Sequence, residues 1–155
     1  MFKNIKYTKS TLLLAAAAVT ILNFESCKKY EDGPAFSLRS KKARLTGEWE
    51  LVKINGQSPE QYFGYSSFYS LNIEWEFESD NDFKSTYSYS YNNGSYSYSY
   101  SDSYTGEWEW EDNKEAIEIS LDGYGSSDEY EIKRLTNKEL TIEYENNVEW
   151  EFEKK

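Results

Sequence analysis

The chain lacks histidine altogether, and it has a single cysteine, Cys27, and two prolines among its 155 residues. Without histidine there is no imidazole base, no Ser-His or Cys-His catalytic pair and no histidine-ligated zinc site. One cysteine rules out a disulfide within the chain and leaves a thiolate metal site without enough ligands. The side chains on which many hydrolytic and metal-dependent active sites rely are therefore missing.

Basic residues are in the minority, because 17 lysines and arginines face 28 aspartates and glutamates, for a net charge of -11. A surface with this charge repels phosphate backbones, so nucleic acid is not expected as a partner. Aromatic residues make up 18% of the chain, whereas disordered chains are poor in them. We therefore expect one acidic, folded domain from a chain of this length.

The first 26 residues have the layout of a secretory signal peptide. Lys3, Lys6 and Lys9 supply the only charges before residues 10–22, which are uncharged and mostly apolar. This apolar run is too short for a membrane-spanning helix, which needs about 20 residues. We therefore expect residues 1–26 to be absent from the mature protein.

Cys27 ends the stretch NFESC, residues 23–27. The stretch resembles the cleavage box of Gram-negative bacterial lipoproteins, in which a cysteine that carries palmitate and other acyl chains becomes the mature N-terminus. Ser26 fits the small residue that precedes this cysteine, while Phe24 and Glu25 depart from the pattern. A lone thiol in an exported protein also needs a reason, and lipidation supplies one. The resemblance implies that Cys27 carries a lipid that anchors the protein in the cell envelope, at the outer membrane.

Residues 27–45 are polar, include Gly33-Pro34 and show no strong periodicity, which is typical of a flexible tether. Glu31 and Asp32 resemble a surface-export signal of some of these bacteria, but an ordinary solvated linker explains them at least as well. The anchored domain is therefore expected either on the periplasmic face or at the cell surface.

From residue 46 onward, apolar and polar residues alternate with a period of two, which is typical of antiparallel strands with one wet face. Turn signals such as Asp122-Gly123 separate the runs. No helical pattern follows the signal peptide, so a one-faced sheet of this length must bury its apolar side by closing on itself. We predict an all-β domain over residues 46–155, an up-and-down antiparallel barrel of eight or nine strands. The alternation places four tryptophans inside it: Trp49, Trp75, Trp108 and Trp150.

Residues 85–104 alternate tyrosine and serine on either side of Asn93-Gly94. Asn-Gly is the strongest short hairpin signal and predicts a two-residue type I′ loop. A one-residue slip would scatter the rings over both faces, so the pattern specifies one register. That register sets tyrosine opposite tyrosine on the apolar face of the sheet, in the pairs Tyr91–Tyr96, Tyr89–Tyr98 and Tyr87–Tyr100.

Six hydroxyls on an inward face are costly to bury without partners, at about 1 to 3 kcal/mol each. The face is therefore expected to be wet, open at one end or occupied by a ligand. Tyrosine with serine is also a favoured combination in binding surfaces. Two alternatives remain, because the rings could fill space in the core, or the uncharged hairpin could protrude and pair with another chain. The candidate ligand wall consists of Tyr87, Tyr89, Tyr98 and Tyr100.

Three stretches resemble lipocalin-like domains: LTGEWEL at residues 45–51, TGEW at 105–108 with the turn DNK at 112–114, and IKRLTNKEL at 132–140. The resemblance implies a barrel that binds a small apolar or aromatic-stacking ligand, such as a lipid or a glycan, inside it or at its mouth. The alternative is a structural or interaction lipoprotein whose barrel is packed solid. The oligomeric state is left open.

Two further expectations concern the ends of this barrel. The resemblance implies a basic residue over an aromatic ring at the closed end, for which Arg134 is the candidate. The long connection over residues 55–70 is rich in aromatic residues and is expected to act as a lid over the open end.

Catalysis is not expected from the many glutamates. Nearly all of them alternate with apolar residues and so lie on the solvent face, whereas catalytic carboxylates need an enclosed site that shifts a pKa. The acidic turns at Asp80 and Asp82, and at Asp122, Asp128 and Glu129, lack the spacing of a calcium loop. We expect no enzymatic activity, no cofactor and no metal site.

Replacing Cys27 with alanine removes the only thiol in the chain. We predict that the Cys27→Ala protein moves from the membrane fraction to the soluble fraction of lysed cells, because it has no site for the lipid. A Ser26→Ala variant keeps a small residue before the cysteine and serves as the control that stays with the membrane. A Cys27→Ala protein that fractionates as the wild type does would place the anchor elsewhere.

Overall fold

The computed structural model describes residues 38–155, so Cys27, the signal peptide and most of the tether lie outside the described residues. None of the helices in this part of the chain is long and apolar enough to cross a membrane. The elements follow in the order α2 (Lys41–Leu45), β1 (Gly47–Ile54), α3 (Pro59–Tyr62), β2 (Tyr69–Phe77), β3 (Asp82–Asn92), β4 (Ser97–Glu111), β5 (Ala116–Leu121), β6 (Ser127–Leu135), β7 (Glu139–Tyr144), the 3₁₀ turn η2 (Glu145–Asn147) and β8 (Val148–Lys154).

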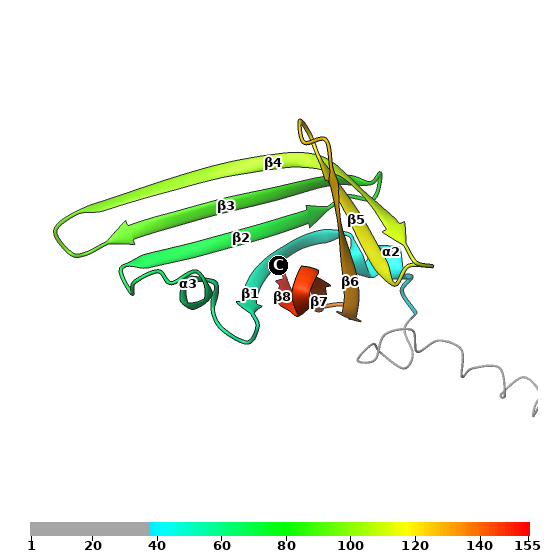
Figure 1. The fold of residues 1–155 in the computed structure, drawn as a ribbon, viewed down its shortest axis with the longest axis horizontal. Coiled ribbons are helices and arrows are strands. Elements are labelled where there is room, and N and C mark those ends of the chain that lie inside the picture. Colours follow the sequence, from blue (N-terminus) through cyan, green and yellow to red (C-terminus); the bar gives the residue numbers. More distant parts are fainter. Residues whose placement is uncertain (1–37) are drawn as a thin grey trace, which may run out of the picture.

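The strands β1 to β8 form a closed barrel in which each strand is antiparallel to its neighbours in the chain and β8 pairs with β1 (Figure 1). The predicted up-and-down barrel is confirmed. Residues 106–111 continue the second arm of the tyrosine hairpin as the last part of β4 and do not form a further strand. The barrel therefore has eight strands, and β4 is 15 residues long against 7 for β8.

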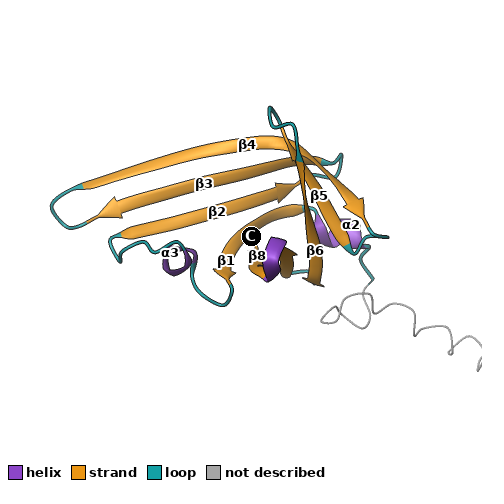
Figure 2. Cartoon of the chain, viewed as in Figure 1, coloured by secondary structure: helices purple, strands orange, loops and turns teal. Residues whose placement is uncertain are grey.

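Strands β2, β3 and β4 extend well beyond the rest of the barrel (Figures 1 and 2). β3 pairs with β4 along its whole length. By contrast, β1 reaches only the last four residues of β2, and β5 pairs with β4 only from Gly106 onward. The unshared parts form a three-stranded projection, here called the ribbon, made of residues 69–73, 85–92 and 97–104.

β4 passes from the ribbon into the barrel at Gly106, where its pairing with β5 begins. A Cβ on this residue would collide with the backbone carbonyl oxygen of Ser120 and would lie 2.9 Å from the Cα of Leu121. Glycine is therefore required here because two backbones approach too closely for any side chain.

Large aromatic side chains fill the body of the barrel. Trp49, Trp75 and Trp108 are at most 5% exposed, and Trp150 packs on Trp75 with 5.5 Å between ring centroids. The inward orientation predicted for the four tryptophans is confirmed. Trp75 touches rings from several strands around the barrel: Phe77, Phe83, Tyr130, Trp150 and Phe152.

Helix α2 closes one end of the barrel. Lys42 of the helix donates to the side-chain oxygen of Asn81 in the β2–β3 turn. Leu45, the last residue of the helix, is fully buried, and its carbonyl accepts the indole N–H of Trp49 at 2.6 Å. The helix therefore covers the apolar core at this end and satisfies the buried indole donor.

A lysine lies over an aromatic ring at the same closed end. Lys154 of β8 places its Nζ 4.8 Å from the ring centroid of Trp49 and donates to the carbonyl oxygens of Arg44 and Thr46. Burial lowers the pKa of this ammonium, with a smaller effect from the charge of Arg39. Lys154 can take this position because it lies opposite Trp49 in the pairing of β8 with β1.

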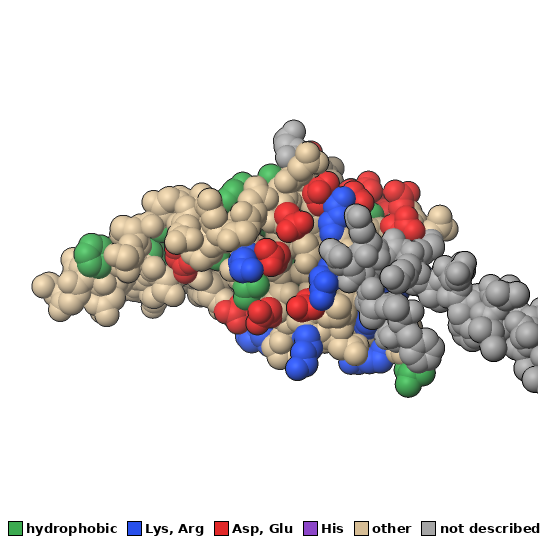
Figure 3. Space-filling model, turned by 90° about the horizontal axis from the view of Figure 1, so that it is seen from below, with side chains coloured by type: hydrophobic (Ala, Val, Ile, Leu, Met, Phe, Trp, Pro, Cys, Tyr) green, Lys and Arg blue, Asp and Glu red, His purple; other side chains and the backbone are tan. Residues whose placement is uncertain are grey.

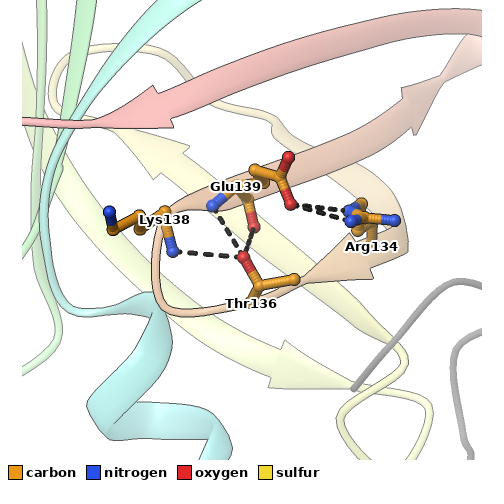
Figure 4. Close-up of polar contacts among 4 residues, drawn as sticks. All are labelled: Arg134, Thr136, Lys138 and Glu139. Carbon is orange, nitrogen blue, oxygen red and sulfur yellow. Dashed lines mark hydrogen bonds and ion pairs between the residues drawn. The ribbon is translucent and has the colours of Figure 1, made fainter. Parts of the chain in front are cut away.

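Arg134, the residue predicted to lie over a ring at this end, is near the end of β6, beside the β6–β7 turn. Its Nε and Nη2 donate to one carboxylate oxygen of Glu139 at 3.0 and 2.8 Å (Figure 4). Thr136 Oγ1 accepts the backbone N–H groups of Lys138 and Glu139 and so tightens the turn between them. Within the described residues, the cation above the Trp49 ring is Lys154, and the ring contact expected for Arg134 stays a prediction.

Adding a methyl group at Gly106 should force β4 and β5 apart. We predict that Gly106→Ala lowers the free energy of unfolding by about 1 to 3 kcal/mol, the usual cost of overpacking. A Gly125→Ala variant is the control, because a Cβ there meets nothing within 4 Å and its effect should stay within about 0.5 kcal/mol. Urea unfolding followed by tryptophan fluorescence measures both. Equal stability of the two variants would show that the close crossing at Gly106 is not a constraint.

Candidate functional site

The inner side of the ribbon is covered by tyrosine rings, here called the tyrosine face: Tyr69 of β2, Tyr87, Tyr89 and Tyr91 of β3, and Tyr98, Tyr100 and Tyr104 of β4. The register places Leu71 opposite Tyr89 and Ile73 opposite Tyr87, and both aliphatic residues belong to the core. Residues directly opposite each other in a sheet point to the same side. The tyrosine face therefore continues the inner surface of the barrel, as the alternation predicted.

The hairpin loop differs from the predicted one. It comprises four residues, 93–96, rather than two, and Gly94 is the residue of the loop with a positive φ, of 84°. The side-chain oxygen of Asn93 accepts the backbone N–H groups of Ser95 and Tyr96 at 3.1 and 2.8 Å. These bonds close a wider turn than type I′, which would need a positive φ at Asn93 as well.

The wider loop shifts the register by two residues. Tyr91 now lies opposite Tyr98, Tyr89 opposite Tyr100, and Tyr87 opposite Asp102. The predicted pairs Tyr91–Tyr96, Tyr89–Tyr98 and Tyr87–Tyr100 are therefore wrong. Because a shift of two preserves the alternation of faces, the rings still share one side of the sheet.

The four residues predicted as a ligand wall lie in one cluster. The ring of Tyr89 lies 5.5 Å from that of Tyr100 and 5.9 Å from that of Tyr98 between centroids, and 5.8 Å from that of Tyr87. Tyr87 and Tyr89 are half-buried against the core, whereas Tyr98 and Tyr100 are 37% and 48% exposed. The cluster thus has a supported half on β3 and an open half on β4.

Several hydroxyls of the tyrosine face have hydrogen-bond partners, and two of these bonds join tyrosines in pairs. The oxygens of Tyr65 and Tyr87 lie 3.3 Å apart, and those of Tyr69 and Tyr98 lie 3.4 Å apart. The hydrogen bond with Tyr65, followed by burial, raises the pKa of Tyr87 to about 12. These pairs account for hydroxyls that would otherwise be costly on an inward face.

The connection between β1 and β2 lies beside the tyrosine face. Ser58 caps the short helix α3 in a capping box, and Glu60 accepts the backbone N–H of Leu71 at 2.8 Å, which covers part of the free edge of β2. Tyr65 and Phe68 of this connection reach the rings of Tyr69 and Tyr91. The connection is therefore placed at the open end as expected, and its movement as a lid stays a prediction.

The opposite side of the mouth carries a second group of tyrosines. Tyr130 and Tyr144 stack with 5.0 Å between ring centroids, and the hydroxyl of Tyr144 donates to Asp128 at 3.1 Å. Burial raises the pKa of Tyr130. Tyr104 of β4 contacts Tyr124 of the β5–β6 loop edge-on. Tyrosines from several strands and loops therefore surround the open end.

Three contributors to this surface were missed from the sequence. Tyr69 alternates with Leu71 and could have been placed on the inner face by that pattern. Asp102 stands where the repeat of β4 would have a tyrosine, which is also visible in the sequence. Tyr65 belongs to the aromatic connection predicted as a lid, but it lies outside any alternating run, so its contact with Tyr87 could not be predicted.

The outer side of the ribbon presents the serines. A shallow hollow of about 330 Å³ lies there, lined mainly by Ser70, Asn72, Ser88, Ser90, Ser99 and Ser101. Figure 3 shows that, on the face it presents, charged side chains gather over the barrel body while the projecting part is largely uncharged. The ribbon therefore differs in surface chemistry from the acidic body that carries it.

One compact group of carboxylates occurs among the described residues, formed by Glu109, Glu111 and Glu118 with their oxygens within 4.8 Å of one another. Partial burial and the charges of Glu118 and Glu109 raise the pKa of Glu111. The group lies on the outer face of β4 and β5, away from the two acidic turns weighed for calcium from the sequence. Exposed carboxylates of this kind are common on acidic surfaces, and the group by itself indicates no site.

A family model described as a lipocalin-like domain matches residues 45–142 of this chain. Among solved structures, a lipocalin-like protein from Bacteroides uniformis ATCC 8492 aligns with 72% of this chain and 99% of its own, at 15% sequence identity and a TM-score of 0.46. A search of curated proteins found no match.

Removing the hydroxyl of Tyr65 should bring the pKa of Tyr87 down from about 12 toward its ordinary value of 10.0. Because the folded state raises this pKa, its contribution to stability is complete below pH 10 and is lost as the pH rises toward 12. We therefore predict that Tyr65→Phe lowers the pKa of Tyr87 and weakens the loss of stability above pH 10. Nuclear magnetic resonance of ring-labelled tyrosine measures the titration.

Tyr62→Phe is the matched control, because it removes an exposed hydroxyl from the same connection. This variant should leave the titration of Tyr87 unchanged. A wild-type Tyr87 that already titrates near pH 10 would show that the bond between the two hydroxyls does not form in solution.

Proposed function

Because this chain belongs to the family of lipocalin-like domains, we propose that it binds a small apolar or aromatic-stacking ligand at the mouth of its barrel, on the tyrosine face. The observation that carries this proposal is the accessible ring cluster of Tyr87, Tyr89, Tyr98 and Tyr100, which continues the inner surface of the barrel into solvent. A soluble protein rarely leaves such a contiguous aromatic surface open without a use for it.

The packing of the barrel body favours the mouth over the interior as the place for a ligand. Trp75, Trp150 and Phe152 lie ring to ring in the middle of the barrel. A ligand that entered between them would have to displace Trp75 and Phe152, which are 5% and 1% exposed. The tyrosine face needs no such displacement, because its β4 half is already exposed.

Tyrosine rings suit a ligand with a flat apolar surface and some polar groups. Each ring offers a large contact area at a low cost in side-chain entropy. Its π face can stack against another ring or against the C–H face of a sugar. The hydroxyls of Tyr98 and Tyr100, which bond to Tyr69 and Asp102, lie at the edge of the cluster. Both ligand classes expected from the sequence, a lipid with an apolar surface and a glycan, fit this description.

The proposal also includes the anchor and the absence of catalysis. A lipid on Cys27 and a tether between Cys27 and helix α2 would hold the barrel at the outer membrane, on its periplasmic face or at the cell surface; residues 41–45, expected as part of the tether, belong to the helix. The support for this part comes from the signal-peptide layout and the NFESC stretch alone. The protein would act as a binding protein, not an enzyme, because its glutamates alternate outward.

A second candidate function is self-association through the ribbon, which the edge of β4 favours. Within the described residues, 97–104 of β4 have a partner strand on one side only. A long, nearly uncharged edge is a template for another strand. A second copy of the same strand in antiparallel orientation could place tyrosine beside tyrosine, because the Ser/Tyr alternation reads alike in both directions.

The proposed function is tested with N-phenylnaphthylamine, a neutral aromatic dye whose fluorescence rises in apolar surroundings. We predict that the wild type binds the dye and that Tyr89→Ser with Tyr98→Ser weakens binding about tenfold or more, which corresponds to about 1.4 kcal/mol and follows from the loss of two ring contacts. The control, Ser88→Ala with Ser99→Ala, changes the outer side of the same two strands and should leave binding unchanged.

The outcomes separate the candidate functions. Unchanged dye binding by the folded fraction of the tyrosine double variant would show that these rings are core and nothing more. A wild type that binds no dye but sediments as a dimer, which dissociates on Ser99→Lys with Ser101→Lys, would favour self-association in place of ligand binding.

A further inference from the structure

Asp102 takes a position at which the Ser/Tyr repeat of β4 would have a tyrosine. Tyrosines occupy positions 98, 100 and 104 of this strand, and serines occupy 97, 99, 101 and 103. Asp102 therefore stands in the register of the tyrosines, and it lies directly opposite Tyr87 of β3. Its carboxylate is consequently on the tyrosine face, whereas the glutamates of the barrel strands lie on the outer side.

The surroundings of Asp102 hold its carboxylate in place. Tyr100 donates its hydroxyl to Oδ2 at 3.1 Å, and the backbone N–H of Ser103 donates to Oδ1 at 2.9 Å. The hydrogen bond to Asp102 and its charge raise the pKa of Tyr100, and the charge of Asp102 raises that of Tyr104. The carboxylate of Asp102 therefore lies between these two tyrosines of β4 and bonds to the first of them.

No lysine or arginine of the ribbon faces this charge. The inward positions of its three described strands carry tyrosine, leucine, isoleucine, serine and Asp102 alone. Lys84, at the base of β3, lies opposite Glu76 and Thr105 and so belongs to the outer side. The other carboxylate at the mouth, Asp128, also accepts a tyrosine hydroxyl, that of Tyr144.

An aromatic surface with a fixed carboxylate is suited to a positively charged ligand. The face of a tyrosine ring is electrostatically negative and attracts an ammonium centre placed over it, and this attraction adds to that of the carboxylate. An anionic ligand would meet repulsion from Asp102, from Asp128 and from a chain with a net charge of -11. A neutral ligand could gain a hydrogen bond to Asp102, whereas a cation would gain the attraction between opposite charges as well.

We propose that the ligand of the tyrosine face is an organic cation, whose alkylated ammonium centre binds beside Asp102 and against the rings of Tyr87, Tyr100 and Tyr104. The inference rests on the proposed function and adds the charge of the ligand to it. Tyr87 lies across the strand pair from Asp102, and Tyr100 and Tyr104 lie on either side of it along β4. Three rings therefore border the carboxylate.

Choline and its uncharged isostere 3,3-dimethylbutanol test this proposal, because the two differ in charge and hardly in shape. Titration of ring-labelled protein, followed by nuclear magnetic resonance, gives both dissociation constants. The wild type should bind choline about tenfold or more tightly than the alcohol, and rising salt should narrow the difference. Asp102→Asn should weaken choline binding about tenfold while leaving the alcohol unchanged.

Two further variants make the test specific. Asp80→Asn removes the same charge from the β2–β3 turn at the closed end, so it should leave choline binding nearly unchanged. Asp102→Tyr restores the repeat and replaces the carboxylate with another ring, so it should weaken choline binding even if Asp102→Asn does not fold. Asp128→Asn then shows how much of the preference comes from the second carboxylate.

Each remaining outcome is decisive. Equal binding of choline and 3,3-dimethylbutanol, unchanged by loss of Asp102, would overturn the proposal while leaving a ligand site on the tyrosine face. Failure of both probes where N-phenylnaphthylamine still binds would overturn it as well. Failure of all three probes would refute the proposed function itself.

Discussion

Trp75 makes the contacts on which the rest of the molecule depends, because its ring touches both Phe83 of β3 and Phe152 of β8. These strands belong to different walls, so one side chain ties together elements that local pairing alone would not join. The aromatic filling supports closure of a small barrel in a chain whose single cysteine cannot form an internal disulfide. It also occupies the space in which a larger barrel would enclose a ligand. The ligand of the proposed function is therefore expected at the mouth, where the ribbon extends the same inner surface beyond the filled part.

The period of two predicted the side of the sheet that each ring takes, and it did so even where the hairpin register was wrong. Tyr89 faces inward whether its partner is Tyr98 or Tyr100, because a shift of two residues leaves the faces unchanged. The loop length could not be predicted in the same way. It depends on whether Asn93 adopts a positive φ or uses its side-chain oxygen to accept two backbone N–H groups. Both options suit Asn-Gly, and no alternation distinguishes them.

The ribbon could not be predicted from the alternating pattern. Alternation predicts that a strand exists, but not over what length a neighbouring strand pairs with it. Gly106 lies in an alternating run, where a glycine often marks the end of a strand, and the sequence left the number of strands at eight or nine. The structure gives this glycine a different purpose, since it lets β4 cross β5 where a Cβ would collide with Ser120. A strand thus runs through the glycine, and its first half has no partner on the side where β5 would be. The length over which two strands pair depends on the whole barrel, so it is known only from the closed structure.

The negative charges on the outside of the barrel repel one another, which lowers its stability. On the outside of the barrel, glutamate lies directly opposite glutamate at several places, such as Glu109 with Glu118 and Glu131 with Glu143. Like charges in such positions destabilise a sheet, and only some are relieved, as where Lys133 pairs with both Glu131 and Glu143. The aromatic core must offset the remaining repulsion. An acidic body of this kind attracts cations from a distance. The inner side of the ribbon, by contrast, carries a single carboxylate, that of Asp102. At the proposed cation site, the long-range attraction of the acidic body and the short-range contacts with the rings would act together beside Asp102.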